Sequence, residues 1–269
     1  MSEKFRVMII GTGGMARLFT RILKRKVSAL AVASRYPGKA KALSKRMKVK
    51  WALIEDVDKF NTIIFTTPSK HLPEMVEKVS ENLMKGSLVM DITSVKMGIV
   101  DAVKNKLPNY VEYISLHPLF GPATRNHRKC RIAVIPIRDA GSLNRVVNLF
   151  KRIGLNVVVT APEEHDALMA FIQVAHHVTY LSLALTLWES VDPKLLGKYS
   201  TRSMRQTALM FKSLHRNFKV IKEIQESNIY GDLARRKLIE CINRLGGDDR
   251  EAWKNVEKAL KKLPQAILP

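Results

Sequence analysis

Short apolar runs alternate with amphipathic stretches along the first 160 residues. Apolar, β-rich runs recur at residues 5–10, 29–33, 62–66, 88–91, 113–116, 131–136 and 156–160. Stretches with helical periodicity lie between them, at residues 14–23, 39–47, 72–82, 98–107 and 142–153. Strands that alternate with helices predict an α/β fold, in which helices cover both faces of a parallel sheet.

The pattern changes after Ala161 and Pro162. From Glu163 onward no run is typical of a strand, and the periodicity stays helical through Trp188, over residues 195–227 and from Tyr230 to the end. Pro162 followed by two glutamates is a typical helix start, because acids in the first turn complement the helix dipole. We therefore expect two domains, an α/β domain over residues 1–161 and an all-helical domain over residues 162–269.

A glycine-rich motif joins the first predicted strand to the first predicted helix. It reads Gly11-Thr12-Gly13-Gly14-Met15-Ala16. In this context the first glycine makes a tight turn, Gly13 leaves room for a pyrophosphate, and Ala16 allows the helix to pack closely on the strand. The motif predicts a Rossmann-type, doubly wound sheet that binds a dinucleotide through Gly11, Gly13, Gly14, Met15 and Ala16.

The end of the second predicted strand bears on which dinucleotide binds. A site that prefers NAD offers a carboxylate to the ribose hydroxyls there, whereas this chain offers Ser34 and Arg35, with Lys39 following. A hydroxyl and a guanidinium hold a 2′-phosphate by charge-assisted hydrogen bonds, so NADP is favoured over NAD. A solvated basic turn is the alternative interpretation.

The charge is strongly basic and unevenly distributed. Among 269 residues, 46 lysines and arginines against 24 acids give a net charge of +22, of which +18 falls within residues 1–160. Such a surface attracts nucleic acids, but equally attracts anionic metabolites and phosphorylated cofactors. Aromatic residues make up only 7% of the chain and do not interleave with the basic groups, which disfavours nucleic-acid binding.

Other features exclude further classes of protein. The longest apolar run, residues 174–187, is interrupted by polar side chains, so we expect no membrane span. The N-terminus lacks a secretory pattern, so we expect a cytoplasmic protein. Two cysteines cannot make a disulfide framework, and no histidine spacing is typical of metal ligands, so we expect no metal site.

Two polar residues follow predicted strands where ligands bind in open α/β sheets. Ser94 lies shortly after the strand at residues 88–91, and His117 directly follows the strand at residues 113–116. An imidazole is well suited to take a proton near neutral pH. The alternative role for Ser94 is to cap the next helix.

The first helix of the second domain carries polar residues on one side. Asp166, Gln173, His177 and Tyr180 share a face if the helix is regular, and such groups are costly to bury without partners. They indicate a lined pocket. A buried helix whose few polar groups bond to their neighbours is the alternative.

The ordered set of motifs resembles the prephenate and arogenate dehydrogenase family of tyrosine biosynthesis. The motifs are the glycine-rich turn, Thr66-Thr67-Pro68, Asp91-x-x-Ser94-Val95-Lys96, the segment from His117 to Pro122, Glu164-His165-Asp166, and Gln173-x-x-x-His177. The resemblance implies an oxidoreductase that decarboxylates prephenate to 4-hydroxyphenylpyruvate, or arogenate to tyrosine, with hydride transfer to NADP or NAD. It also implies a homodimer formed through the helical domain.

The same resemblance implies residue roles. His117 is the catalytic histidine on the substrate hydroxyl, and Ser94 orients it. Gln173 and His177 belong to the substrate pocket, and Thr67 and Pro68 to cofactor binding. The family's carboxylate-binding arginine falls in a segment that contains Arg202 and Arg205, and both stay open for a small anionic substrate.

The sequence leaves two other functions open. Another two-domain dehydrogenase or reductase, such as a 3-hydroxyacid dehydrogenase, usually relies on a lysine in the helical domain, and no lysine lies between Glu163 and Val191. A basic dinucleotide- or nucleic-acid-binding protein that has lost catalysis is the second alternative. His117 and Ser94 at strand ends favour retained chemistry.

Overall fold

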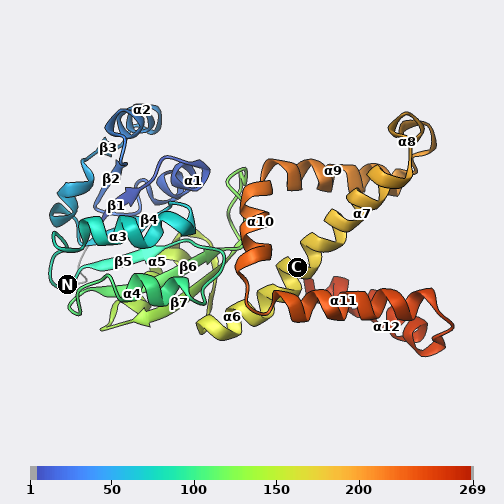
Figure 1. The fold of residues 1–269 in the computed structure, drawn as a ribbon. Helices are drawn as coiled ribbons and strands as arrows, with labels where there is room; N and C mark the ends of the chain where they lie inside the picture. The colour runs from blue at the N-terminus through green and yellow to red at the C-terminus, as the bar shows by residue number, and fades with distance from the viewer. Residues whose placement is uncertain (1–4, 268–269) are drawn as a thin grey trace. The chain divides into compact units, whose positions relative to one another are not determined.

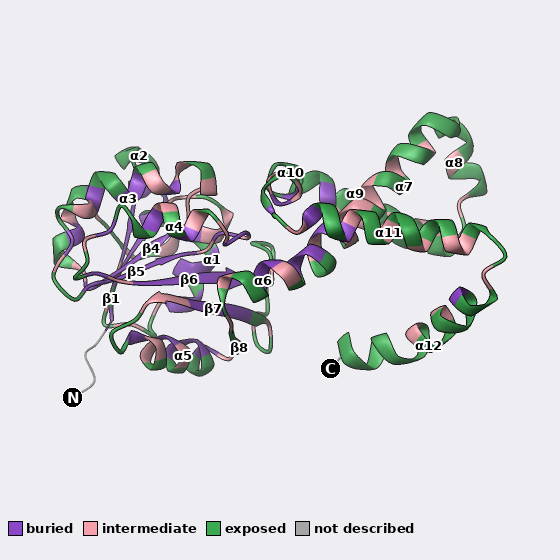
Figure 2. Cartoon of the chain, turned by 60° about the horizontal axis from the view of Figure 1, so that its bottom comes forward, coloured by how far each residue is buried: buried purple, intermediate pink, exposed green. Residues whose placement is uncertain are grey.

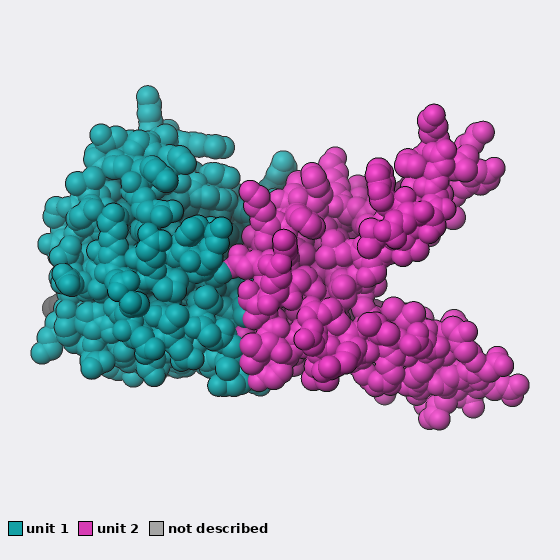
Figure 3. Space-filling model, in the orientation of Figure 1, with its two compact units in different colours: residues 1–165 teal, residues 166–269 magenta. Residues whose placement is uncertain are grey.

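The computed structural model describes residues 5–267, and the chain divides into two compact units, residues 1–165 and residues 166–269 (Figure 3). The sequence predicts a change of architecture after residue 161, whereas the division falls after His165, inside the first helix of the second region. The first unit is an α/β domain and the second is built from helices, as expected (Figure 1).

The first unit is built on an eight-stranded sheet with the order β3-β2-β1-β4-β5-β6-β7-β8. Strands β1 to β6 run parallel, β7 runs antiparallel to β6, and β8 is parallel to β7. The order reverses between β1 and β4, which is where doubly wound sheets bind dinucleotides. The strands are β1 Arg6–Ile10, β2 Ala29–Ala33, β3 Lys50–Trp51, β4 Thr62–Phe65, β5 Leu88–Asp91, β6 Glu112–Pro118, β7 Arg131–Arg138 and β8 Asn156–Val159.

The sheet differs from the expected parallel sheet in one strand direction and in one additional strand. Strand β7 is reversed because residues 119–130, which join it to β6, contain no crossover helix, and an antiparallel neighbour needs none. Strand β3 was not predicted, because two exposed residues are too short to show a pattern of alternation.

Helices pack on both faces of the sheet, as the alternation within β1 requires. Val7 and Ile9 face a core that includes Phe19 of α1 and Phe150 of α5, while Met8 faces the core of α3 and α4. All three β1 side chains are fully buried. The helices of this unit are α1 Gly14–Leu23, α2 Pro37–Met47, α3 Leu72–Ser80, α4 Ile99–Lys104 and α5 Ser142–Ile153, with short 3-10 turns η1 Ile54–Lys59 and η2 Ser69–His71.

The described part of the second unit contains helices and no strand. Its first helix starts at Pro162, as predicted, but contains a π-helical turn that the sequence pattern did not reveal. Its elements are α6 Pro162–Met169, which begins before the division, the π turn η3 Ala170–Ala175, α7 His176–Ser190, α8 Pro193–Tyr199, α9 Arg202–Arg216, α10 Phe218–Ser227, α11 Gly231–Gly246 and α12 Arg250–Ile267.

Most residues of these helices are exposed (Figure 2), and large apolar side chains are among them. The continuous helix Pro162–Ser190 is long and apolar enough to cross a membrane, and only 17% of its most apolar window is buried. The polar residues that led us to expect no membrane span do not prevent this helix from meeting the criteria of length and composition. One helix of this kind is weak evidence for a membrane span, since the same surface suits contact with another protein.

Candidate functional site

The dinucleotide motif is held where β1, β2 and β4 end side by side. Gly11 has φ +134°, and a Cβ there would lie 2.2 Å from Thr66 Oγ1, so both backbone and space require glycine. Its N–H donates to Ala33 O at 2.9 Å, and Thr66 N donates to Ile10 O at 2.9 Å. These two bonds hold the turn after β1 against the ends of β2 and β4.

The rest of the motif forms the start of α1. A Cβ on Gly13 would meet nothing within 4 Å, and no side chain of the described residues caps the helix there. Helix N-termini of this kind bind phosphate through backbone N–H groups and the helix dipole. Ala16 is fully buried and packs with Met15 against the core, while Gly14 lies against Pro122.

Thr67 adds a second indication that a ligand binds at this edge. Its Oγ1 is buried and has no hydrogen-bond partner among the described residues. Buried hydroxyls are rarely left without a partner, so an external group is the natural acceptor or donor. Pro68, the next residue, is exposed. The open space at Gly13 and the hydroxyl of Thr67 together fit a dinucleotide.

The turn after β2 presents a hydroxyl and two cations. Ser34 Oγ accepts a hydrogen bond from Tyr36 N at 3.2 Å, and Lys39 Nζ lies 4.7 Å from the centre of the Tyr36 ring. Arg35 lies 3.8 Å from Glu74 Oε1, with both side chains well exposed. An exposed pair of this kind is weak, so Arg35 can exchange its carboxylate for a phosphate at little cost.

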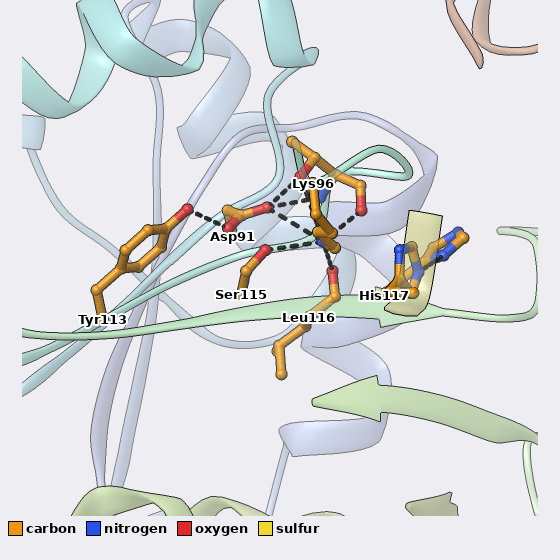
Figure 4. Close-up of polar contacts among 8 residues, drawn as sticks. Asp91, Lys96, Tyr113, Ser115, Leu116 and His117 are labelled. Carbon is orange, nitrogen blue, oxygen red and sulfur yellow. Dashed lines mark hydrogen bonds and ion pairs between the residues drawn. The ribbon is translucent and has the colours of Figure 1, made fainter. Parts of the chain in front are cut away.

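A fully buried lysine joins the ends of β5 and β6 (Figure 4). Lys96 Nζ donates to Thr93 O at 2.7 Å, to Ser115 Oγ at 2.8 Å and to Leu116 O at 2.8 Å. It also lies 3.8 Å from Asp91 Oδ1. Because Leu116 directly precedes His117, the ammonium group fixes the backbone that presents this histidine.

Asp91 is the buried counter-charge of this network. Its carboxylate accepts hydrogen bonds from Tyr113 OH at 2.7 Å and from Thr93 Oγ1 at 2.6 Å. Burial raises the pKa of Asp91. The Lys96 charge and the hydrogen bonds from Ser115 and Thr93 together lower it by more than burial raises it, so the pKa lies below the usual value. Burial and the Asp91 charge raise the pKa of Tyr113 well above its usual value.

Asp91 and Lys96 belong to a motif that the sequence reveals, but the sequence alone predicts no role for either. The available signal was two opposite charges at the end of an apolar strand, where unpaired charges are not tolerated. Ser94, which was predicted, is half-buried in the same segment. It does not cap the next helix, since α4 begins after Gly98.

His117 lies at the end of β6 and is 4% exposed. Its Nδ1 lies 2.9 Å from Nε2 of His165, with the two rings edge to face. Burial, together with the charges of Lys96 and His165, lowers the pKa of His117 well below its usual value. A role as general base requires the neutral His117 tautomer with its proton on Nδ1, which donates to Nε2 of a neutral His165 and keeps a lone pair on its own Nε2.

His165 is a third residue to which the sequence assigned no role, after Asp91 and Lys96. The family resemblance included it in the motif Glu164-His165-Asp166 without a role. The contact joins residues 48 positions apart, so local spacing carries no sign of it.

The predicted substrate residues lie in the second unit. Burial, followed by the nearby His176, lowers the pKa of His177 to about 4. Gln173 Oε1 and His177 Nδ1 are both buried and have no hydrogen-bond partner among the described residues. Arg202 and Arg205 are exposed at the start of α9. Since the π turn breaks regular helical spacing between Asp166 and His177, the single stripe expected from a uniform period does not hold.

No group of three or more potential metal-binding side chains occurs within residues 5–267. The structure thus brings together two sets of predicted residues in the first unit. One set is the glycine motif with Thr67, and the other is the segment of Ser94 with His117. The buried groups Lys96, Asp91 and His165 complete the second set.

Comparisons with known proteins identify the family of the nucleotide-binding unit. Residues 19–159 match the family model of the prephenate dehydrogenase nucleotide-binding domain. A probable arogenate/prephenate dehydrogenase of Methanocaldococcus jannaschii is 29% identical over 95% of this chain, and a probable NADP(+) prephenate dehydrogenase of Schizosaccharomyces pombe is 24% identical over 69%. The chain spans 60% and 44% of the lengths of these two relatives.

A solved structure extends the likeness to nearly the whole fold. Prephenate dehydrogenase from A. aeolicus, in complex with hydroxyphenyl propionate and NAD+, has a TM-score of 0.81 and 20% identity. The alignment covers 99% of this chain and 98% of that one. Since the nucleotide-binding family model spans more than half of the sequence and both units share this fold, the chain belongs to the prephenate dehydrogenase family.

Proposed function

We propose that this protein oxidatively decarboxylates prephenate to 4-hydroxyphenylpyruvate, or arogenate to tyrosine. The observation that carries the proposal is the environment of His117, a buried imidazole held neutral at a strand end, with one nitrogen bonded to His165. Perturbed titrating groups of this kind concentrate at catalytic sites. The names of the M. jannaschii and S. pombe relatives support the same reaction.

In this proposal His117 takes the proton of the substrate ring hydroxyl through Nε2, while His165 holds the opposite nitrogen. Ser94 orients the hydroxyl and the imidazole. Bound NAD(P) supplies the hydride acceptor. The C–O bond becomes a carbonyl as hydride leaves the carbinol carbon. The ring carboxylate departs as carbon dioxide, its bonding electrons shift into the ring and onto the carbonyl oxygen, and the resulting phenolate takes the proton back from His117 to give the aromatic phenol. The protein mainly positions an anionic substrate beside an oxidised cofactor.

We assign cofactor binding to the loop from Gly11 to Ala16, to Thr67 and Pro68, and to the turn after β2. NADP is favoured over NAD, because Ser34, Arg35 and Lys39 offer hydrogen-bond donors where a carboxylate would repel a 2′-phosphate.

We assign the substrate side to Gln173 and His177, whose buried polar atoms lack partners among the described residues. The π turn that carries Gln173 supports this assignment, since such turns are frequent at functional sites. Arg202 or Arg205 would bind a substrate carboxylate. Both remain candidates because both are exposed.

A cytoplasmic homodimer formed through the helical unit completes the proposal. Its support is the set of large apolar side chains exposed on these helices, which includes Leu185, Trp188, Leu209, Leu233 and Ile242. A second copy covering them would bury surface that is otherwise unfavourable in water. The basic charge is explained by steering of two anionic ligands, so no nucleic-acid partner is proposed.

The direct test is absorbance at 340 nm with purified protein, prephenate or arogenate, and NADP or NAD. We expect reduced cofactor to form with at least one substrate, and with NADP at lower concentration than with NAD. Arg35→Ala should raise the KM for NADP and leave that for NAD nearly unchanged. No reduction in any of the four combinations contradicts the proposed reaction, and an unchanged KM for NADP removes Arg35 from the site.

A further inference from the structure

The loop that follows His117 packs against the helix of the dinucleotide motif. A Cβ built on Gly14 would lie 2.7 Å from Pro122 Cβ and 3.1 Å from Pro122 Cγ, so the proline occupies the space of a side chain at position 14. Nearby, Arg21 on the same helix donates to Thr124 O at 2.5 Å. Two contacts therefore connect α1 with the loop of residues 119–130.

The two adjacent glycines of the motif differ in what surrounds them. Gly13 faces open space, as a phosphate-binding position requires. Gly14 has no positive φ that would require glycine, and glycine at a helical position is disfavoured by about 1 kcal/mol relative to alanine. The feature that excludes a side chain at Gly14 is Pro122.

The loop is well defined between this contact and the catalytic strand. Leu119 N donates to Arg131 O at 3.0 Å, which continues the pairing of β6 with β7, and Thr124 N donates to Gly121 O at 3.1 Å. Phe120 packs against the core beneath. Pro122 itself is exposed, and two backbone hydrogen bonds and the packed Phe120 connect its loop with the end of β6, where His117 lies.

We propose that Gly14 and Pro122 form a positioning contact that fixes the His117 segment against the dinucleotide-binding helix. The inference rests on the proposed function and adds a role for two residues in it. The contact fixes the position of His117 relative to the bound cofactor, because α1, which would bind the cofactor phosphates, also supports the loop that follows His117. Small misplacements of catalytic groups strongly reduce turnover, so disturbing the contact should affect kcat more than cofactor affinity.

The test is a double-mutant cycle between Gly14→Ala and Pro122→Gly, with Gly13→Ala as the matched control. Gly14→Ala should lower kcat about 10- to 100-fold, with a much smaller change in the KM for the dinucleotide. In the Pro122→Gly background the added methyl has room, so Gly14→Ala should cause no further loss. Gly13→Ala should instead raise the KM for the dinucleotide.

Limited trypsin digestion gives a readout that does not depend on activity. Arg125 and Arg128 are exposed in the loop. Without ligands, Gly14→Ala should increase cleavage after these residues several-fold, whereas Gly13→Ala should not. The proposal would be overturned if Gly14→Ala lowered kcat equally in the parent and in the Pro122→Gly background, or if it left trypsin cleavage of the loop unchanged. Absence of turnover in the parent protein would instead count against the proposed function, and the digestion would still test the contact.

Discussion

His117 is surrounded by groups that disfavour its protonated form. Burial is the largest influence, and Lys96 and His165 act in the same direction, so the pKa of His117 lies well below its ordinary value. The same ammonium group bonds to the carbonyl of Leu116, just before the histidine. One lysine therefore helps to fix both the position and the protonation state of the proposed base.

This environment predicts how folding stability depends on pH. The unfolded chain binds a proton at His117 below pH of about 6.5, whereas the folded chain does not until a much lower pH. Proton binding at His117 therefore leaves the free energy of unfolding unchanged above that pH. As the pH falls from there toward the lower pKa of His117 in the folded chain, the free energy of unfolding decreases. His177, with a pKa of about 4, acts in the same direction.

Urea unfolding at pH 7.5, 6.5 and 5.5 measures this dependence. We expect the free energy of unfolding to fall over this range, and to fall less steeply in His117→Asn. If the variant and the parent lose stability in parallel, His117 is not held neutral by the fold.

The buried pair of Lys96 and Asp91 makes a second prediction at this scale. Lys96→Met leaves the Asp91 carboxylate buried without its counter-charge, so we expect a loss of about 3–5 kcal/mol in the free energy of unfolding. The double variant Asp91→Asn with Lys96→Met should lose less than the sum of the two single variants. Equilibrium urea denaturation measures all four proteins. Strict additivity would show that the two charges do not depend on each other.

At the scale of elements, the ends of helices are set by residues with particular backbone conformations. Gly154 ends α5 with φ +94°, and a Cβ there would lie 3.3 Å from Arg128 Cγ. Gly154→Ala should therefore destabilise the protein by about 1–2 kcal/mol. Gly38→Ala is the matched control, because Gly38 lies within α2 and a Cβ there would meet nothing within 4 Å. Thermal unfolding separates them, and equal effects would contradict the role of Gly154.

Much of the first unit's secondary structure was predictable. The limits of α1, β2, β5 and α5 coincide with those expected from apolar periodicity. The reversed strand β7 was not predictable, because direction depends on the connection and not on alternation within the strand. The π turn was missed because a single period was assumed throughout the helix.

Candidate residues at strand ends were predictable for the same reason, since the pattern of a doubly wound sheet locates its ligand-binding edge. Their partners were not. Lys96 with Leu116, and His117 with His165, are contacts between distant parts of the chain, and only the folded structure brings them together.

For the whole molecule, the exposed apolar surface of the helical unit predicts self-association. Trp188 is 75% exposed and Leu185 is 56% exposed. Light scattering coupled to size exclusion should give the mass of a dimer, and Trp188→Glu should shift it toward the monomer at low concentration. Tyr110→Glu, a change to an exposed aromatic residue in the other unit, serves as the control. A parent protein that is monomeric at every concentration would contradict the proposed dimer.

The most direct test of the central claim compares turnover by the parent protein and His117→Asn under saturating substrate and cofactor. Asparagine keeps polarity and removes the base, so the account predicts a fall in kcat of about 10²- to 10⁴-fold with dinucleotide binding retained. A variant that reduces the cofactor as fast as the parent would contradict the assignment of His117 as the catalytic base.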